Sequence, residues 1–274
     1  MAQVARVVPL EPPAPGSSAV SAAPSAKRWH ERFVLFYSPL WIAAGAACMF
    51  GPWLGRWEDP GHLALGVGLA LPLWLVPLVW PAPADRGRPL LERHGIRWSL
   101  WIAVHTFLQM YFGSILFFDR LGMEYHFRTT WELNRSPVFL YFLTLCYFST
   151  YYAVFQRLLG LFDRRFPAAR PGSRLLVRAG LCYATAFTET FFMGSEVMAL
   201  FFRYRDRAFM LACGSLCYGT VFFVSLPLAL RLDEREQPSA PIGEVLYRLL
   251  GANMLILVLY EIYGGVIAWW GPPA

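Results

Sequence analysis

The sequence contains few charged residues: they make up 15% of its 274 positions, compared with about 25% in soluble domains. Lys27 is the single lysine, so every other basic residue is an arginine. Hydrophobic residues fill 57% of the chain, and its mean hydropathy is +0.41. Because so few charges cannot cover a water-exposed surface, these values exclude an ordinary soluble domain and indicate a membrane protein.

Cysteine is also scarce. The five cysteines are an odd number and all fall in apolar stretches, which excludes a disulfide framework and predicts that they pack as small hydrophobic residues. Cys213 and Cys217 are four residues apart, but no histidine or carboxylate accompanies them as a metal ligand. We therefore expect no metal site.

The net charge of +6 raises the question of nucleic-acid binding. The arginines, however, fall between the hydrophobic runs, where contact with lipid headgroups and control of topology explain them better. We expect membrane lipid rather than nucleic acid as the partner of these charges. The sequence leaves the oligomeric state open.

The chain divides into a short tail and a long apolar region. Residues 1–26 are rich in Ala, Pro and Ser and are predicted to be a disordered tail. Residues 27–274 are predicted to form one all-α, polytopic membrane helix bundle of about seven transmembrane helices, since a span needs about 20 mostly apolar residues. The seven candidate spans are 33–54, 62–81, 98–118, 137–161, 175–202, 208–230 and 245–270.

The distribution of basic residues predicts the orientation of the bundle. If the N-terminus is cytoplasmic, seventeen basic residues fall on the cytoplasmic side and seven on the far side. Loops rich in arginine and lysine stay in the cytoplasm. The sequence therefore predicts a cytoplasmic N-terminus and, with seven spans, a C-terminus on the far side.

Polar residues inside the predicted spans form three pairs: Glu189 with Glu196, His105 with Gln109, and Asn253 with Glu261. An ionisable side chain costs at least about 2.5 kcal/mol at the centre of a bilayer, so each needs a reason to be there. The members of each pair are spaced so that we expect them to share a helix face. One interpretation is a polar pocket where the third, fifth and seventh spans converge, and the other is interhelical hydrogen bonding that fixes packing.

Glu189 is the first candidate catalytic residue, because it lies near the middle of its predicted span. Low dielectric disfavours a charged carboxylate, so we expect a neutral acid that can donate a proton to an apolar substrate. His105 and Glu196 are candidates to relay or accept a second proton. Aromatic residues form 17% of the chain; their rings could stabilise a carbocation or simply pack between helices.

Several ordered stretches across about residues 27–255 resemble the cycloeucalenol cycloisomerases, the membrane enzymes of plant-type sterol synthesis. They include Arg28-Trp29-His30-Glu31-Arg32-Phe33, Ala84-Asp85-Arg86, Tyr111-Phe112, Trp131, Asn134, Glu189-Thr190, Tyr218, Ser225-Leu226-Pro227 and Leu250-Gly251-Ala252. The resemblance implies opening of the 9,19-cyclopropane ring of a cyclopropyl sterol. Protonation of carbon 19 gives a cation at carbon 9, and loss of the carbon 8 proton gives the alkene. This redox-neutral reaction implies no cofactor.

The candidate substrate-binding residues follow from the resemblance and the polar layer: Tyr111, Phe112, Trp131, Asn134, Tyr218, Glu261 and His30. His30 is expected at the membrane surface, where it fixes the start of the first helix; contact with the sterol hydroxyl is the other interpretation.

Two other functions stay open on the sequence. A sterol- or lipid-binding membrane protein of the same fold could lack the activity, and a transporter is less favoured because no internal repeat is present. The excess of arginine over lysine suggests a GC-rich genome, hence a bacterial cytoplasmic membrane, or the endoplasmic reticulum in a eukaryote.

Overall fold

The computed structural model describes residues 25–51, 53–233 and 240–271. Its long helices are α1 (Ser25–Phe50), α2 (Asp59–Val79), α5 (Val138–Arg165), α6 (Pro171–Met193) and α9 (Ile242–Trp270). Two more helices each contain a π-helical turn: α3 (His94–Leu108) continues through η3 (Gln109–Gly113) into α4 (Ser114–Asp119), and α7 (Arg207–Phe209) through η4 (Met210–Gly214) into α8 (Ser215–Arg231). This confirms the predicted all-α bundle.

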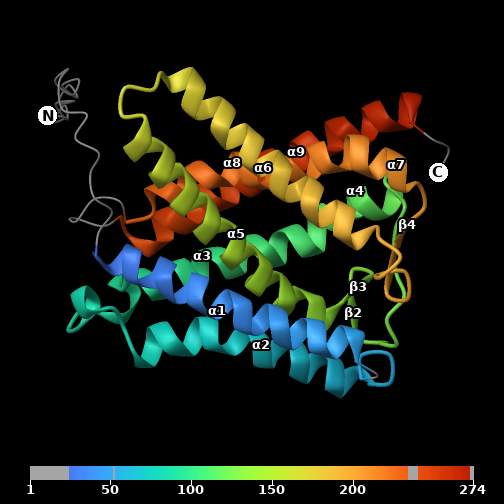
Figure 1. Cartoon of the computed structure of the whole chain (residues 1–274), viewed down its shortest axis with the longest axis horizontal. Helices are drawn as coiled ribbons and strands as arrows, with labels where there is room; N and C mark the ends of the chain where they lie inside the picture. The colour runs from blue at the N-terminus through green and yellow to red at the C-terminus, as the bar shows by residue number, and fades with distance from the viewer. Residues whose placement is uncertain (1–24, 52, 234–239, 272–274) are drawn as a thin grey trace, which may run out of the picture.

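Short elements connect the helices. Two 3-10 turns, η1 (Pro83–Asp85) and η2 (Leu90–Glu92), join α2 to α3. Strand β1 (Met123–Tyr125) pairs antiparallel with β4 (Phe202–Tyr204), and β2 (Glu132–Leu133) pairs with β3 (Ser136–Pro137) through a turn at Asn134 and Arg135. Both turn residues have positive φ, as a two-residue type I′ hairpin requires. All the strands lie at the end of the bundle away from the start of α1 (Figure 1).

Six of these long helices are long and apolar enough to cross a membrane, which makes the chain a multi-pass membrane protein. Among the described residues the exception is α6, which carries Arg174, Arg178 and Glu189. The predicted fifth span also ends too late, because α6 ends at Met193 and residues 194–201 form turns. The predicted tail lies outside the described residues, except that Ser25 and Ala26 already belong to α1.

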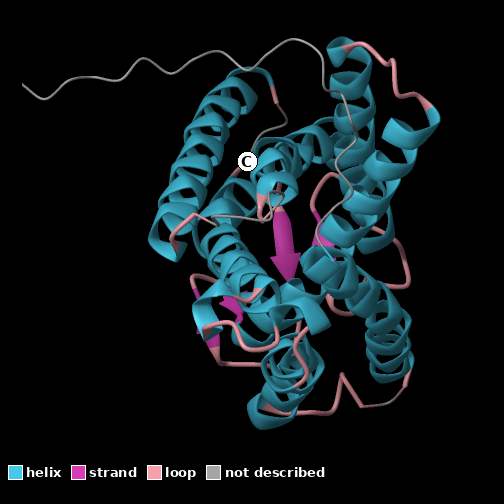
Figure 2. Ribbon diagram, turned by 90° about the vertical axis from the view of Figure 1, so that its left-hand side faces the viewer, coloured by secondary structure: helices cyan, strands magenta, loops and turns pink. Residues whose placement is uncertain are grey.

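Helix α5 is the centre of one half of the bundle, where it packs against α1, α2 and α3. In the other half α8 packs against α6 on one side and α9 on the other. Figure 2 looks along the bundle and shows one strand pair between the helices and the other at the edge of the bundle. The core between them is aromatic: Trp101, Tyr152, Phe155 and Phe222 are almost completely buried.

Helices α2 and α5 are in close contact at Gly66. A methyl group at Gly66 would lie 2.6 Å from the backbone oxygen of Phe139, which cannot move without shifting α5. We expect Gly66→Ala to lower the free energy of unfolding by about 1–3 kcal/mol, as overpacking does. Gly68→Ala is the matched control, because nothing lies within 4 Å of a methyl group there. Equal unfolding midpoints for the two variants in one detergent would contradict this packing.

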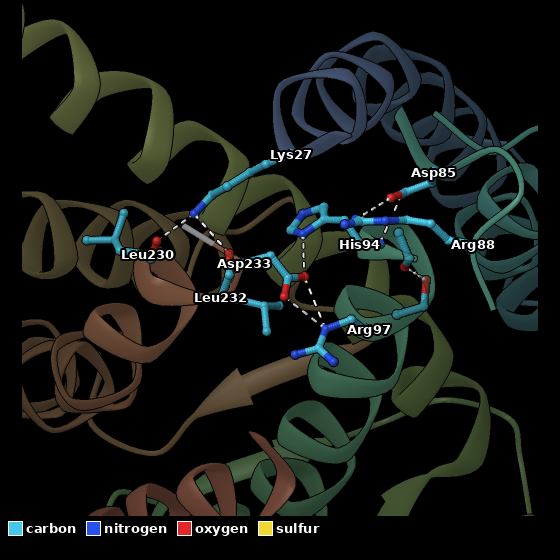
Figure 3. Close-up of polar contacts among 10 residues, drawn as sticks. Lys27, Asp85, Arg88, His94, Arg97, Leu230, Leu232 and Asp233 are labelled. Carbon is cyan, nitrogen blue, oxygen red and sulfur yellow. Dashed lines mark hydrogen bonds and ion pairs between the residues drawn. The ribbon is translucent and has the colours of Figure 1, made fainter. Parts of the chain in front are cut away.

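A cluster of buried charges holds the opposite end of the bundle from the strands; we call Lys27, Asp85, His94, Arg97 and Asp233 the end clamp (Figure 3). The Nε of Arg97 lies 2.9 Å from Oδ1 of Asp233, and Nδ1 of His94 lies 2.9 Å from its Oδ2. The amide of His94 donates to Asp85. Lys27 donates to the carbonyl of Leu230, so α1, α3 and the end of α8 are joined in one network.

Candidate active site

A cavity of about 560 Å³ lies in the half of the bundle that carries the strands. This volume is within the range of about 300–1,000 Å³ that is usual for small-molecule sites. The cavity is lined by residues of α1, α2, α4, α5, α6, α8 and α9, the η3 and η4 turns, and the strands β1 and β4. Most of the lining is apolar or aromatic, with seven phenylalanines and six tyrosines among the described residues. Such a cavity suits a bulky, mostly apolar molecule.

Glu189 is the one carboxylate among the described cavity residues, and no histidine, lysine or arginine joins it there. The hydroxyl of Tyr218 donates to its Oε2 over 2.7 Å. Tyr151 also hydrogen-bonds to it. Tyr151 lies near the middle of α5 and Tyr218 near the middle of the helix that runs from α7 to α8, whereas Glu189 is only one turn from the end of α6.

Two further tyrosines reach the cavity from the strands, Tyr125 on β1 and Tyr204 on β4. Burial raises the pKa of both phenols above the ordinary value, and the negative charge of a Glu189 carboxylate raises each further. Both therefore stay protonated at neutral pH and can act as hydrogen-bond donors. The strand pairing of Tyr125 with Phe202 fixes their place at this end of the cavity.

Aromatic rings surround the acid. Phe117 lies edge-on to both Tyr218 and Tyr260, with ring centroids 5.9 and 5.8 Å apart. Tyr218 in turn contacts Phe222 at 5.2 Å. An acid held among aromatic rings, with no other charged group in the described part of the cavity lining, can protonate an apolar substrate and stabilise the cation that results.

Behind the cavity wall runs a chain of buried polar side chains. The amide of Gln109 donates to Oδ1 of Asn253 over 2.8 Å, and Nδ1 of His105 lies 3.0 Å from the same oxygen. On its other side, Nε2 of His105 lies 3.0 Å from the hydroxyl of Tyr152, which bonds to Ser225. Gln109 lines the cavity, whereas His105 does not. The expected contact between the third and seventh predicted spans is thus present, as a hydrogen-bonded chain.

The predicted positions of Glu196 and Glu261, each on the same helix face as another polar residue, are wrong. Glu196 was expected on the face of Glu189, but α6 ends at Met193 and Glu196 lies exposed in the following turn. Glu261 was expected in line with Asn253, but a spacing of eight residues turns a helix by about 80° beyond two full turns. Asn253 is therefore buried while Glu261 is exposed.

Four candidate substrate-binding residues lie outside the cavity. Tyr111 and Phe112 are exposed on the bundle surface and pack on each other at 4.7 Å. Trp131 is also exposed, and its backbone N–H donates to Asp59. Asn134 forms the positive-φ turn between β2 and β3 and bonds to the carbonyl of Tyr111. The structure shows that these residues shape the strand end of the bundle rather than line the cavity.

His30 is buried beside the end clamp, in the second turn of α1, close to where that helix begins. Its ring lies 5.7 Å from that of His94 and 6.0 Å from that of Trp98. Of the sequence-predicted site residues, the cavity thus brings together Glu189 and Tyr218, with Gln109 and Tyr151 beside them.

Sequence reasoning missed the tyrosines that the strands and α9 bring to the cavity: Tyr125, Tyr204 and Tyr260. A signal was present for the first two. The residues of β1 and β4 alternate between apolar and charged side chains, which is typical of a short strand with one buried face. Tyr260 carried no such signal, because most positions around it in the last span are apolar.

Comparison with known proteins gives one informative relative. The chain is 30% identical over 257 residues to the cycloeucalenol cycloisomerase of Arabidopsis thaliana, with 90% of each protein covered. No family model matches the chain, and no solved structure matches it.

Proposed function

The chain belongs to the cycloeucalenol cycloisomerase family, and from that membership we propose that it opens the 9,19-cyclopropane ring of a membrane-dissolved cyclopropyl sterol. The single observation that carries the proposal is Glu189, the one carboxylate in a large aromatic cavity. A sterol is itself a bulky apolar molecule, so the cavity and the substrate agree in size and character.

The proposed first step is proton donation by Glu189. The neutral acid gives its proton to carbon 19, the bond between carbons 9 and 19 breaks, and a cation forms at carbon 9. Tyr218 and Tyr151 then stabilise the carboxylate that remains by donating hydrogen bonds to it. The rings of Phe117 and Tyr218, which line the cavity, shield the cation from water and stabilise it.

The second step needs a base that takes the proton from carbon 8. Glu196 is outside the cavity and His105 is behind its wall, so the Glu189 carboxylate left by the first step is the base at hand. We propose that it accepts the carbon 8 proton, which forms the alkene between carbons 8 and 9 and restores the acid. The electrons of the broken bonds stay in the sterol, so no redox cofactor takes part.

A deuterium-transfer experiment tests both steps. Purified protein in lipid nanodiscs is given a cyclopropyl sterol carrying deuterium at carbon 8, in ordinary water. We expect the 8,9-alkene as product, with part of the deuterium recovered in the new methyl group of later product molecules. Product without such transfer would assign the second proton to another base. Saturable binding without product would favour a sterol-binding protein without this activity.

We propose the bacterial cytoplasmic membrane as its location. The support is the near absence of lysine, which suggests a GC-rich genome, and the excess of arginine on one side of the predicted spans.

A further inference from the structure

Gln109 and Tyr260 are two buried polar residues of the cavity that the proposed reaction does not use. The side-chain oxygen Oε1 of Gln109 and the hydroxyl of Tyr260 have no hydrogen-bond partner among the described residues. Gln109 is 7% exposed and Tyr260 4% exposed, and both line the cavity. Buried polar atoms without partners are rare in folded proteins, because each costs the free energy of its lost hydration.

The two side chains converge over Gly113. A methyl group at Gly113 would lie 2.6 Å from Oε1 of Gln109 and 3.3 Å from the ring of Tyr260. Glycine therefore keeps open a small space that is bordered by both polar groups. Gln109 and Gly113 are the first and last residues of the π-helical turn η3. Such turns are frequent at functional sites.

The hydrogen-bonded chain behind the wall fixes which atom Gln109 presents. The amide nitrogen of Asn253 donates to the carbonyl of Leu249, so its Oδ1 must accept from the other side. This oxygen accepts from Nε2 of Gln109 and from the Nδ1–H of His105. The nitrogen of Gln109 is thereby bonded to Asn253, and its oxygen Oε1 is left as a buried acceptor without a partner, in a residue of the cavity lining.

We propose that Gln109 and Tyr260 form a subsite that binds the hydroxyl group of the sterol substrate. The hydroxyl donates to Oε1 of Gln109 and accepts from the hydroxyl of Tyr260, so both unpartnered atoms become paired. His105 acts here as a positioning residue, because it helps to fix the orientation of Asn253 and through it that of Gln109. The subsite rests on the proposed function for the identity of the ligand as a sterol.

The place of the subsite fits the reaction. Tyr260 and Tyr218 lie on the same ring of Phe117, and Tyr218 donates to Glu189. In a cyclopropyl sterol the hydroxyl-bearing ring shares a carbon atom with the cyclopropane. A ligand held at Gln109 and Tyr260 therefore presents its cyclopropane to the region of the acid, and the subsite sets the register of the sterol in the cavity.

The test compares binding of a plain 3β-hydroxy sterol with that of the same sterol lacking the hydroxyl. Neither ligand contains a cyclopropane, so binding is measured without turnover, by competition against a tritiated hydroxy sterol in nanodiscs. We expect the wild type to prefer the alcohol by about tenfold or more, as paired buried hydrogen bonds do. Gln109→Met and Tyr260→Phe should each reduce this preference several-fold while the deoxy sterol binds as before.

Gln156→Met is the matched control. Gln156 is also a buried glutamine with an unpartnered oxygen in a long helix, but it does not line the cavity. This variant should keep the wild-type preference. Tyr260→Phe preserves the ring and its packing, so it provides a result if Gln109→Met does not fold.

Two results would overturn the subsite: a wild type that binds both ligands equally or not at all, and folded variants that keep the wild-type preference. Failure of the isomerase reaction is a separate result, because the binding test needs no chemistry. Conversely, turnover of alcohol and deoxy cyclopropyl sterols at equal rates would remove the subsite and leave the isomerase proposal intact.

Discussion

Replacing Glu189 by glutamine should give a folded protein that still binds sterol but turns over at least ~100-fold more slowly. General acid–base groups contribute about 10²–10⁴-fold, and proton donation to a strained carbon depends wholly on the acid. Glutamine keeps the shape of the side chain and can still accept the hydrogen bond from Tyr218. The loss should therefore appear in kcat, with little change in the affinity for sterol, when product formation is measured by mass spectrometry.

Glu196→Gln makes the same chemical change outside the cavity. Glu196 lies exposed in the turn after α6, so this variant should keep near wild-type turnover. If the Glu196 variant were the slow one and the Glu189 variant normal, the acid would be Glu196 after a rearrangement of residues 194–201. Near wild-type turnover in both variants would require a different proton donor.

Removing the charge of Asp233 should have the largest effect on stability. Asp233→Asn leaves the guanidinium of Arg97, which is 2% exposed, without its counter-charge. Breaking a buried ion pair by removing one partner costs about 3–5 kcal/mol. We expect the free energy of unfolding to fall by about 3 kcal/mol, measured by denaturant titration in detergent micelles.

Asp119→Asn is the matched control for Asp233. Its partner Arg135 also lies 2.9 Å away, but both side chains are about half exposed, so the pair should contribute less than about 1 kcal/mol. Equal losses in the two variants would show that burial of the end clamp does not matter to stability.

The contribution of Asp233 to the free energy of unfolding should also depend on pH. Burial alone would raise the pKa of Asp233, but the hydrogen bond and charge of His94 and the charges of Arg97 and Lys27 outweigh it and lower the pKa. A group with a lowered pKa in the folded state stabilises fully above its unfolded pKa of about 3.9. The difference in the free energy of unfolding between wild type and Asp233→Asn should thus have its full size at neutral pH and shrink as the pH falls below about 4.

The sequence predicted the helices well because apolar runs of this length have few alternatives in a membrane. The end of α6 was the exception. Residues 197–202 continue the apolar run, so hydropathy did not reveal that the chain turns at Gly194 and passes into β4. A high hydropathy indicates only that a segment prefers an apolar environment. The interior of a protein provides such an environment as well as a bilayer does, so hydropathy does not distinguish the two.

The candidate site was predicted in part, and the reason lies in helix geometry. Glu189 could be found from its cost in a membrane, and Tyr218 from the family resemblance. The polar partners of Glu189, Tyr151 and Tyr218, lie on two other helices, so no spacing within its own helix predicts them. Contacts such as Tyr260 with Phe117 depend on tertiary packing, which no local pattern records.

The lack of other ionisable groups beside Glu189 also bears on whether protons can move across the membrane through this cavity. No other carboxylate, histidine or basic residue joins it among the described residues that line the cavity. The end clamp includes Lys27 in the first turn of α1, and α1 begins at the end of the bundle away from the strands. A path that carries protons across a bilayer needs a series of ionisable groups leading to each surface. The acid chemistry proposed for Glu189 therefore has, among the described cavity residues, no series of ionisable groups that would link it to a transmembrane proton gradient.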